Sequence, residues 1–271
     1  MLFRSLLREY TARDAQEPTQ EELARGLIPT WWAEVRPPLP ATAGLHRWVW
    51  DLRLPSPRTT TKGYPIGAVP HRTPRDPQGL WVPPGHYTVQ LWHGDEMWSQ
   101  PLEVTPDPRL PAAGRAGVEE QFRVLRPLYT AFDLAASDEG IVRSLLEQVQ
   151  AADQRLGRRH RAHETLQRYE KALRAVYDDT PGTTPTVGVS SLLRELGELY
   201  GMTTRGDAPP NAAQSAALAS LLQTAGPVLA RTAGVLGDVD RVNQKLRGTG
   251  VQLNPSVPPV RDGKLADQDE E

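Results

Sequence analysis

Few residues in this chain have the types and spacing that metal binding needs. Of the six histidines, only His160 and His163 are spaced to share one face of a helix. A zinc site needs three or four convergent ligands, and the sequence implies no third ligand beside this pair. Arg158, Arg159 and Arg161 surround the two histidines. We therefore interpret the cluster as a solvated basic helix start and predict neither a metal site nor a cofactor.

Paired carboxylates are the second kind of residue that could do chemistry. They occur at Glu119-Glu120 and Asp178-Asp179. Glycoside hydrolysis needs two carboxyl groups ~5–10 Å apart across a cleft, whereas sequence neighbours on a helix do not face each other. We interpret the glutamates as favouring the dipole of a first helical turn, and the aspartates, near a helix end, as solvated. Asp51 and Glu103 are interpreted as strand-edge or turn residues, so no catalytic residue is predicted.

The tryptophans are the best candidates for a binding site, because exposed aromatic rings can stack on sugars or bind a partner's surface. Four of them lie in irregular proline-rich segments or on the outer face of a predicted hairpin: Trp31, Trp32, Trp81 and Trp92. The alternative is that these rings cover a sheet edge or pack against helices or a neighbouring domain. The other three, Trp48, Trp50 and Trp98, are predicted to face inward and supply a core.

The stretch Trp81–Val104 (WVPPGHYTVQLWHGDEMWSQPLEV) predicts the β-hairpin that would position Trp92 and Trp98. Apolar residues alternate with Thr88, Gln90 and Trp92, the pattern of a half-buried strand. Gly94-Asp95 fits a two-residue type II′ turn, with glycine where φ must be positive. The return strand then places four residues on one face: Trp98, Gln100, Leu102 and Val104.

The first half of the chain is predicted to be β-structure. The segment His46–Leu52 has strand alternation, and residues 31–36 and 64–69 could add edge strands beside the hairpin. Together they predict a small antiparallel sandwich of the immunoglobulin-like or fibronectin-like kind over residues 30–106. Residues 1–29 form an N-terminal extension, in which Thr19 and Glu22 can cap a short helix.

The second half is predicted to be helical. An apolar stripe runs from Val118 to Leu156, with a kink or break expected at Pro127. Further helices are predicted near 158–178 and 190–200, and a last one runs from the cap Asn211 to Leu246 with a kink at Gly226-Pro227. The sequence thus predicts an α+β protein: the sandwich, a linker at 107–116, an antiparallel helical bundle at 117–250 and a disordered tail at 251–271.

Composition excludes several classes of function. The 271 residues carry a net charge of −2, which gives no electrostatic reason for a nucleic-acid or anionic-membrane partner. The chain has no cysteine, so disulfides, thiolate metal sites and a cysteine nucleophile are excluded. No apolar run approaches the ~20 residues of a membrane helix, so membrane insertion is not expected.

Several phrases of the chain resemble a known family. From Trp31 to Arg109 the sequence is similar to the C-terminal part of large bacterial proteins with sortilin-like or BNR-type β-propeller repeats, often labelled glycosyl hydrolase-like. The resemblance extends to Leu192–Tyr200 and Ala208–Gln223 in the helical half. The phrases that carry it are PPL before AGLHRWVWDLR, then YPIGAVP, PGHYTVQL, QPLEV and DPR.

The resemblance implies a non-catalytic module that docks on a β-propeller or another protein. Family members carry propellers upstream, usually behind a secretion signal, and neither is found in this sequence. We therefore expect a C-terminal fragment or a stand-alone descendant, with export implied by the family but no signal peptide to confirm it. Two alternatives stay open: a glycosidase-like hydrolase whose catalysis lies outside this chain, and a glycan-binding module that uses the exposed tryptophans.

Overall fold

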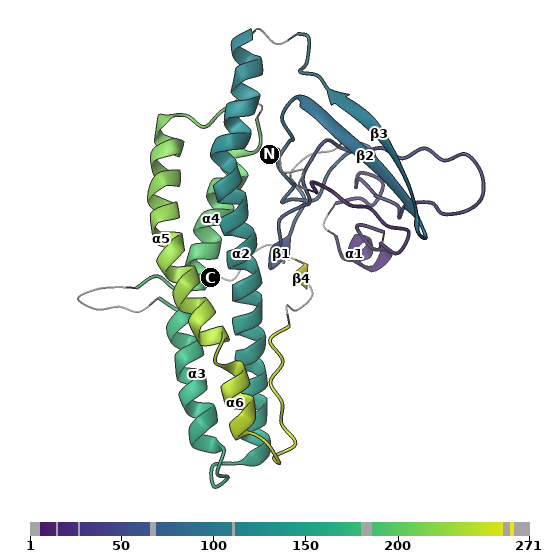
Figure 1. The fold of residues 1–271 in the computed structure, drawn as a ribbon. Helices are drawn as coiled ribbons and strands as arrows, with labels where there is room; N and C mark the ends of the chain where they lie inside the picture. Colours follow the sequence, from purple (N-terminus) through teal and green to yellow (C-terminus); the bar gives the residue numbers. More distant parts are fainter. Residues whose placement is uncertain are drawn as a thin grey trace.

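The computed structural model describes residues 6–14, 16–26, 28–65, 69–109, 112–179, 186–206, 208–256 and 261–262. It is a mixed α+β protein, in which an irregular first half carrying a small hairpin lies beside a long helical bundle (Figure 1). The helices are α1 (Gln20–Arg25), α2 (Ala112–Leu156), α3 (His163–Tyr177), α4 (Val189–Thr203), α5 (Ala212–Leu236) and α6 (Val239–Lys245). The strands are β1 (Thr61–Lys62), β2 (Gly85–His93), β3 (Glu96–Val104) and β4 (Arg261–Asp262).

The bundle is organised along α2, whose 45 residues span about 68 Å. Helices α3 and α4 return along α2, and α5 with α6 runs back in the direction of α2, so three rods lie side by side (Figure 1). The four apolar residues predicted to point inward from α3 are all buried: Leu166, Tyr169, Leu173 and Val176. The second half is therefore helical, with α3 and α4 antiparallel to α2 and with α5 and α6 parallel to it. None of the helices described in the structure is long and apolar enough to cross a membrane.

The prolines inside α2 and α5 do not break these helices, although a break was one of the two outcomes predicted for Pro127. Helix α2 continues through Pro127, and α5 continues through Pro227. Pro127 has no amide to donate to the Arg123 carbonyl, and both residues lie on the exposed side of the helix. The final helix, predicted to run to Leu246, instead ends at Leu236: the Gly237 amide donates to the Ala233 carbonyl, and α6 starts afresh at Val239.

Both predicted helix caps are confirmed. The Thr19 hydroxyl accepts from the Glu22 amide at 3.2 Å, and the Glu22 carboxylate accepts from the Thr19 amide at 2.8 Å. Asn211 and Gln214 exchange the same pair of bonds at the start of α5, both at 2.9 Å. These reciprocal bonds satisfy amides that have no partner inside the helix.

The predicted β-sandwich is not formed in the described part of the chain. Its β-structure is the antiparallel hairpin β2–β3 and a two-residue parallel pair, β1–β4. The expected strand His46–Leu52 is irregular, and Leu52 adopts a φ of 57°, outside the extended region. The expected edge strand near 31–36 contributes only single bridges, Arg36 with Glu17 and Ala33 with Thr73. The described residues of the other expected edge strand, 64–69, form no bridge, and residues 66–68 lie outside the described ranges.

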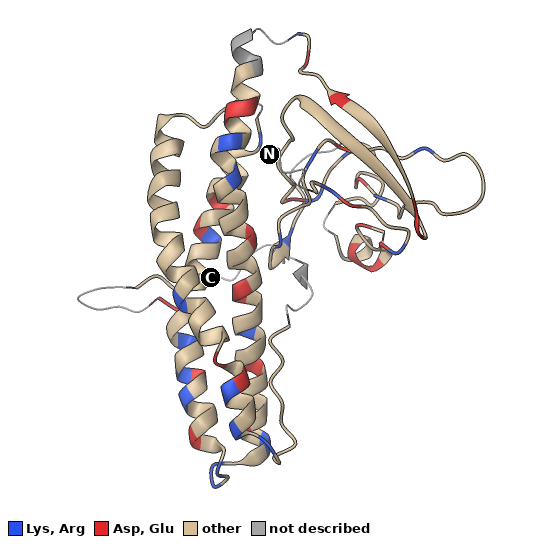
Figure 2. Cartoon of the chain, viewed as in Figure 1, with Lys and Arg blue, Asp and Glu red and all other residues tan. Residues whose placement is uncertain are grey.

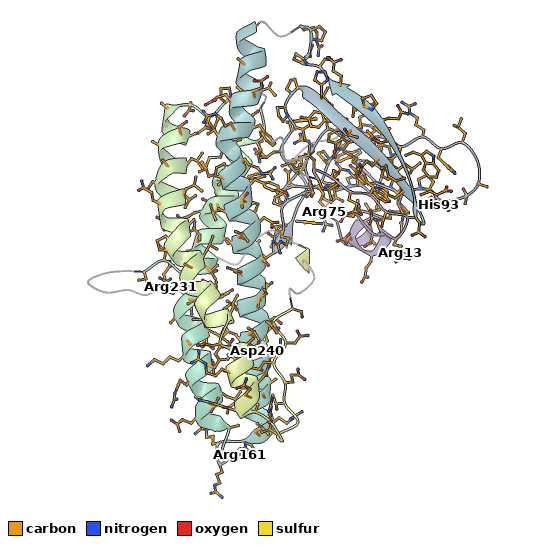
Figure 3. All side chains as sticks on the ribbon, viewed as in Figure 1. Arg13, Arg75, His93, Arg161, Arg231 and Asp240 are labelled. Carbon is orange, nitrogen blue, oxygen red and sulfur yellow. The ribbon has the colours of Figure 1, made fainter. Side chains whose placement is uncertain are left out.

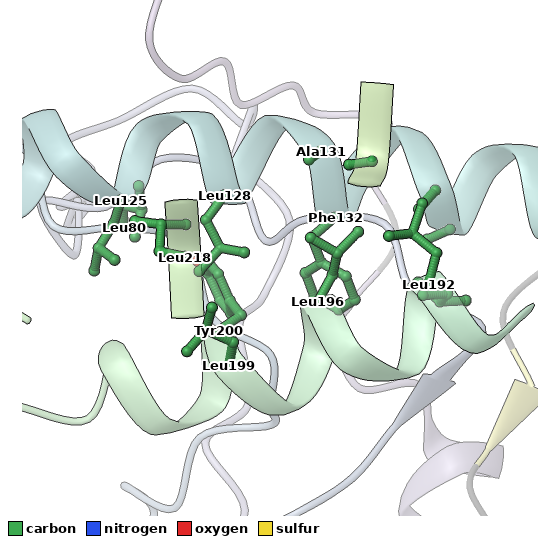
Figure 4. Packing of buried hydrophobic residues seen from close by; sticks show 14 of the residues in the cluster. Leu80, Leu125, Leu128, Ala131, Phe132, Leu192, Leu196, Leu199, Tyr200 and Leu218 are labelled. Atoms are coloured by element: carbon green, nitrogen blue, oxygen red, sulfur yellow. The ribbon is translucent and has the colours of Figure 1, made fainter. Parts of the chain in front are cut away.

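The irregular half and the bundle share one hydrophobic core. Leu54, Leu80 and Val82 are buried in one cluster with residues of α2, α4 and α5, and Figure 4 shows Leu80 beside Leu125. Two tyrosines of the bundle donate to carbonyls of the same loops: Tyr200 to Gln78 at 2.7 Å and Tyr129 to Pro55 at 3.1 Å. Residues on both sides of the composition change near residue 110 therefore contribute to the same core.

An ion pair at the protein surface also joins the irregular half to α2. The Arg58 guanidinium donates to Asp133 on α2, with Nη2 and Oδ2 2.6 Å apart, and to the Ser137 hydroxyl at 3.0 Å. The Arg58 amide also donates to Asp133, at 2.6 Å. The bonded carboxylate raises the pKa of Arg58. Because the side chain and the backbone of Arg58 are both bonded, this contact fixes the loop as well as the charge.

The segment after α6 packs on the bundle where a disordered tail was predicted. Leu253 is buried, and Asn254 exchanges hydrogen bonds with the Gln148 side chain on α2, at 2.8 and 2.9 Å. Beyond it, β4 pairs in parallel with β1 of the first half. The remaining residues of the predicted tail, 257–260 and 263–271, lie outside the described ranges.

Candidate interaction surface

The hairpin β2–β3 forms with the register that its turn dictates. Gly94 has a φ of 59°, as the first central position of a type II′ turn requires. Leu91 pairs with Trp98, Val89 with Gln100 and Tyr87 with Leu102. The alternating residues of both strands consequently share one face, as predicted.

The base of the hairpin is anchored on the irregular half. The Tyr87 ring meets the Trp50 ring edge-on at a centroid distance of 6.0 Å, and the Tyr87 hydroxyl donates to the Pro83 carbonyl at 2.5 Å. The Trp50 indole donates in turn to the Arg53 carbonyl at 3.0 Å. Burial raises the pKa of the Tyr87 hydroxyl. These contacts hold β2 by one end.

The outer part of the hairpin is uncovered on both sides, and every residue from Thr88 to Pro101 is exposed. We call the exposed apolar set Val89, Leu91 and Trp98, which are 51%, 57% and 50% exposed, the hairpin face. Trp92 and Met97, paired with each other on the opposite side, form the reverse face. Figure 3 shows His93 at the end of the hairpin, away from the bundle.

The position of Trp98 corrects a prediction. Trp98 was expected to point into a sandwich core, yet half of its surface is exposed, because no second sheet covers this face in the described chain. Of the other two predicted core tryptophans, Trp48 is half-buried against the Tyr10 ring at 5.1 Å, and Trp50 packs on Tyr87. Val89, Leu91 and Met97 are surface residues that the sequence reasoning missed, since alternation was interpreted as half-burial.

The four candidate binding tryptophans lie in three separate places. Trp31 is exposed and contacts the half-buried Trp32 edge-on at 5.7 Å. The Trp81 ring has the Arg53 guanidinium 3.7 Å from its centroid, so one of its faces is occupied by a cation. Trp92 lies on the reverse face of the hairpin. Among the described residues no ring contact joins these three groups.

The histidine pair does not converge on a common point. His163 Nδ1 lies 2.6 Å from an oxygen of Asp153, whereas His160 Nδ1 accepts the Ala162 amide at 3.1 Å. The His163 contact joins the end of α2 to the start of α3, whereas the His160 contact lies within the turn between the two helices. In the ranges described, no group of three or more histidine, aspartate or glutamate side chains could hold a metal ion.

The candidate carboxylates form ion pairs and hydrogen bonds that stabilise helices and loops. Glu120 pairs with Arg123 at 2.6 Å on α2, and Asp51 pairs with Arg36 at 2.9 Å. Asp179, predicted to be merely solvated, instead bonds to the start of α4: its oxygens accept from the Gly188 amide at 2.7 Å and the Ser191 hydroxyl at 2.8 Å. These bonds lower the pKa of Asp179, the amide bond most. The negative charge also faces the favourable end of the α4 dipole.

Replacing Asp179 with alanine is expected to lower the free energy of unfolding by about 1 kcal/mol, the usual net contribution of an intramolecular hydrogen bond. The depressed pKa means that the contribution of Asp179 is present above its unfolded pKa and is lost as pH falls through the folded value. Chemical denaturation at pH 7 and at pH 3 should therefore show a larger difference between wild type and Asp179→Ala at pH 7. An equal difference at both pH values would refute a role for the ionised carboxylate.

Comparison of this chain with protein-family models, with curated proteins and with solved structures returned no match.

Proposed function

We propose that this chain is a non-catalytic interaction module that docks on another protein through the hairpin face. The supporting observation is the exposed cluster of Val89, Leu91 and Trp98 on a hairpin whose contacts with the rest of the described chain lie at its base. An uncovered two-stranded hairpin gains little stability from its own apolar residues, so their exposure is best accounted for by a partner.

The composition of the hairpin favours a protein as that partner. Aliphatic, methionine and tryptophan side chains are the types enriched at the buried centre of protein interfaces. Figure 2 shows the hairpin largely free of charge, with acidic residues at its tip and near its base. An uncharged centre between charged ends corresponds to the core and rim of an interface. The finer proposal, which rests on the sequence resemblance, is that the partner is a sortilin-like or BNR-type β-propeller protein.

The double variant Leu91→Ser/Trp98→Ser is expected to weaken docking at least 10-fold, because two apolar anchors are removed from the centre of the surface. The measurement is a pull-down from the native cell envelope with the purified chain as bait, scored for a propeller protein at defined stoichiometry. Met202→Ser removes an equally exposed apolar residue from α4 and serves as the matched control. Recovery of the same propeller protein by the double variant would contradict the proposal.

Glycan binding is the second candidate, favoured by the exposed rings of Trp31 and Trp92. Sugar stacking depends on aromatic ring faces and not on neighbouring aliphatic side chains. Glycan-array retention that is lost in a Trp31→Ala/Trp92→Ala variant, but kept by Leu91→Ser, would favour this candidate over protein docking. Retention that the two tryptophan substitutions leave unchanged would exclude it. The third possibility is a glycosidase-like hydrolase. Its catalytic residues would lie outside this chain, and it assigns no role to the hairpin.

A further inference from the structure

The two open edges of the hairpin differ in their ability to accept another strand. In a two-residue hairpin the pair closing the turn is hydrogen-bonded, and bonded and non-bonded pairs then alternate. His93–Glu96 closes the turn, so the outward-facing backbone groups belong to the even-numbered residues of β2 and the odd-numbered residues of β3. Thr88 and Pro101 are one such outward-facing pair.

The β3 edge is blocked. Pro101 has no amide hydrogen, and it stands where that hydrogen would point away from β2, the position at which an edge strand tolerates proline. Glu96 and Glu103 add negative charge near both ends of β3. Proline and charge are the usual protections of a sheet edge against pairing with another chain.

The β2 edge carries none of these protections. From Gly85 to His93 it contains no proline and no aspartate, glutamate, lysine or arginine. Its outward amides and carbonyls belong to His86, Thr88, Gln90 and Trp92, all of them exposed residues. Within the described ranges these groups make no backbone hydrogen bond. This edge can therefore pair with another copy of itself without opposing like charges.

We propose that two copies of this chain associate through antiparallel pairing of their β2 strands, which joins the two hairpins into one four-stranded sheet. The proposal rests on the role of the hairpin as an interaction surface and names a second copy of the chain as the occupant of its open edge. A two-fold axis applies the same edge of both chains to each other, so one uncharged edge is sufficient.

The register follows from the positions of the outward groups. With the two-fold axis at Val89, His86 pairs with Trp92 of the second copy and Thr88 with its Gln90, so all four outward residues lie in hydrogen-bonded pairs. This arrangement gives about eight hydrogen bonds between the copies. An axis at Thr88 or Gln90 leaves one or more of these residues without a partner. The Val89-centred register also places the hairpin faces of both chains on the same side of the joined sheet.

The absence of native cysteine permits a direct test of this register. Val89 would face its own copy in a non-hydrogen-bonded pair, with Cα atoms about 4.5 Å apart, within reach of a disulfide. Val89→Cys is therefore expected to form a disulfide-linked dimer under mild oxidation of the full chain. Gln100→Cys, on the same face but in β3, would lie about 14 Å from its copy and is expected to stay monomeric on a non-reducing gel.

A pair of proline variants tests the edge itself. Gln90 and Ser99 oppose each other across the hairpin, and the amides of both point outward. Gln90→Pro removes a donor from the β2 edge and is expected to raise the dimer dissociation constant at least 10-fold in sedimentation equilibrium. Ser99→Pro makes the same change on the β3 edge and should leave the dissociation constant unchanged.

Charge variants test the same β2 edge without introducing proline, so the dimer can still be tested if the proline variants unfold. Thr88→Lys/Gln90→Lys places lysine opposite lysine in the proposed register and should abolish the dimer, whereas Thr88→Glu/Gln90→Lys places opposite charges together and should restore it. Monomeric wild type, absence of the Val89→Cys crosslink, or equal effects of Gln90→Pro and Ser99→Pro would each overturn the proposal. An extended peptide that binds the β2 edge of a monomeric chain would likewise replace the second copy as occupant.

The two proposals can fail separately. A chain that is monomeric by sedimentation but still captures its protein partner through Leu91 and Trp98 refutes the dimer and leaves the docking function standing. A Val89-linked dimer whose partner capture does not change in Leu91→Ser/Trp98→Ser refutes docking through the hairpin face and leaves the dimer standing.

Discussion

Replacing Gly79 with alanine is expected to lower the free energy of unfolding by about 3 kcal/mol, at the upper end of what overpacking costs. A Cβ atom at position 79 would lie 1.9 Å from the Leu54 carbonyl oxygen and 2.6 Å from the Pro55 oxygen. Both obstacles are backbone, so no side chain can move aside. Separation of the two loops would strain the bond from the Leu54 amide to the Leu80 carbonyl, now 2.9 Å, and lift both leucines from the core.

Equilibrium denaturation in urea measures this effect, with Gly234→Ala as the control. Gly234 lies in α5, and a Cβ atom there would have no neighbour within 4 Å. Alanine in an open helical position is expected to raise stability by about 0.5–1 kcal/mol. A Gly79→Ala protein as stable as wild type would show that the loops bearing Leu54 and Leu80 are not held at this spacing.

Truncation of Leu145 to alanine is expected to destabilise the protein by about 2–5 kcal/mol. Leu145 is fully buried in the second core, which joins the lower part of α2 to α3 and α6. The loss combines the removed apolar contacts with the cavity left behind, because close-packed neighbours collapse only in part.

The matched control lies on the same helix. Leu134 is 45% exposed, and Leu134→Ala removes the same atoms from water-facing surface, with an expected change within about 0.5 kcal/mol. Both variants keep a good helix former, so their difference isolates burial from helix propensity. Equal destabilisation of the two would contradict the assignment of Leu145 to the core.

The features that the sequence predicts well are local ones. Helix α3 has its four apolar residues at helical spacing, and the caps at Thr19 and Asn211 need only residues three positions away, so each is decided within a few turns. The Gly94-Asp95 turn is another local decision. Continuity through Pro127 is different: Leu125 and Leu128 on either side of it are buried against α4 and α5, and that tertiary packing outweighs the local cost of proline.

The features that the sequence does not predict depend on partners distant in the chain. The alternation of Trp48, Trp50 and Leu52 is satisfied by contacts with Tyr10, Tyr87 and the shared core, and not by a neighbouring strand. Alternation in β2 correctly assigns residues to two faces of the hairpin. It cannot tell whether another layer covers either face, and for this reason the exposure of Leu91 and Trp98 needed the structure.

The shared core has a consequence for how the molecule unfolds. Helix α2 carries the first core at one end and the second at the other, and the first core is completed by Leu54, Leu80 and Val82. Division of the chain at its change of composition would expose Leu54, Leu80 and Val82 on one piece, and on the other the part of the first core that these three residues cover. The two dissimilar halves are thus expected to unfold together as one cooperative unit, in which the irregular half packs against one side of the three-rod bundle.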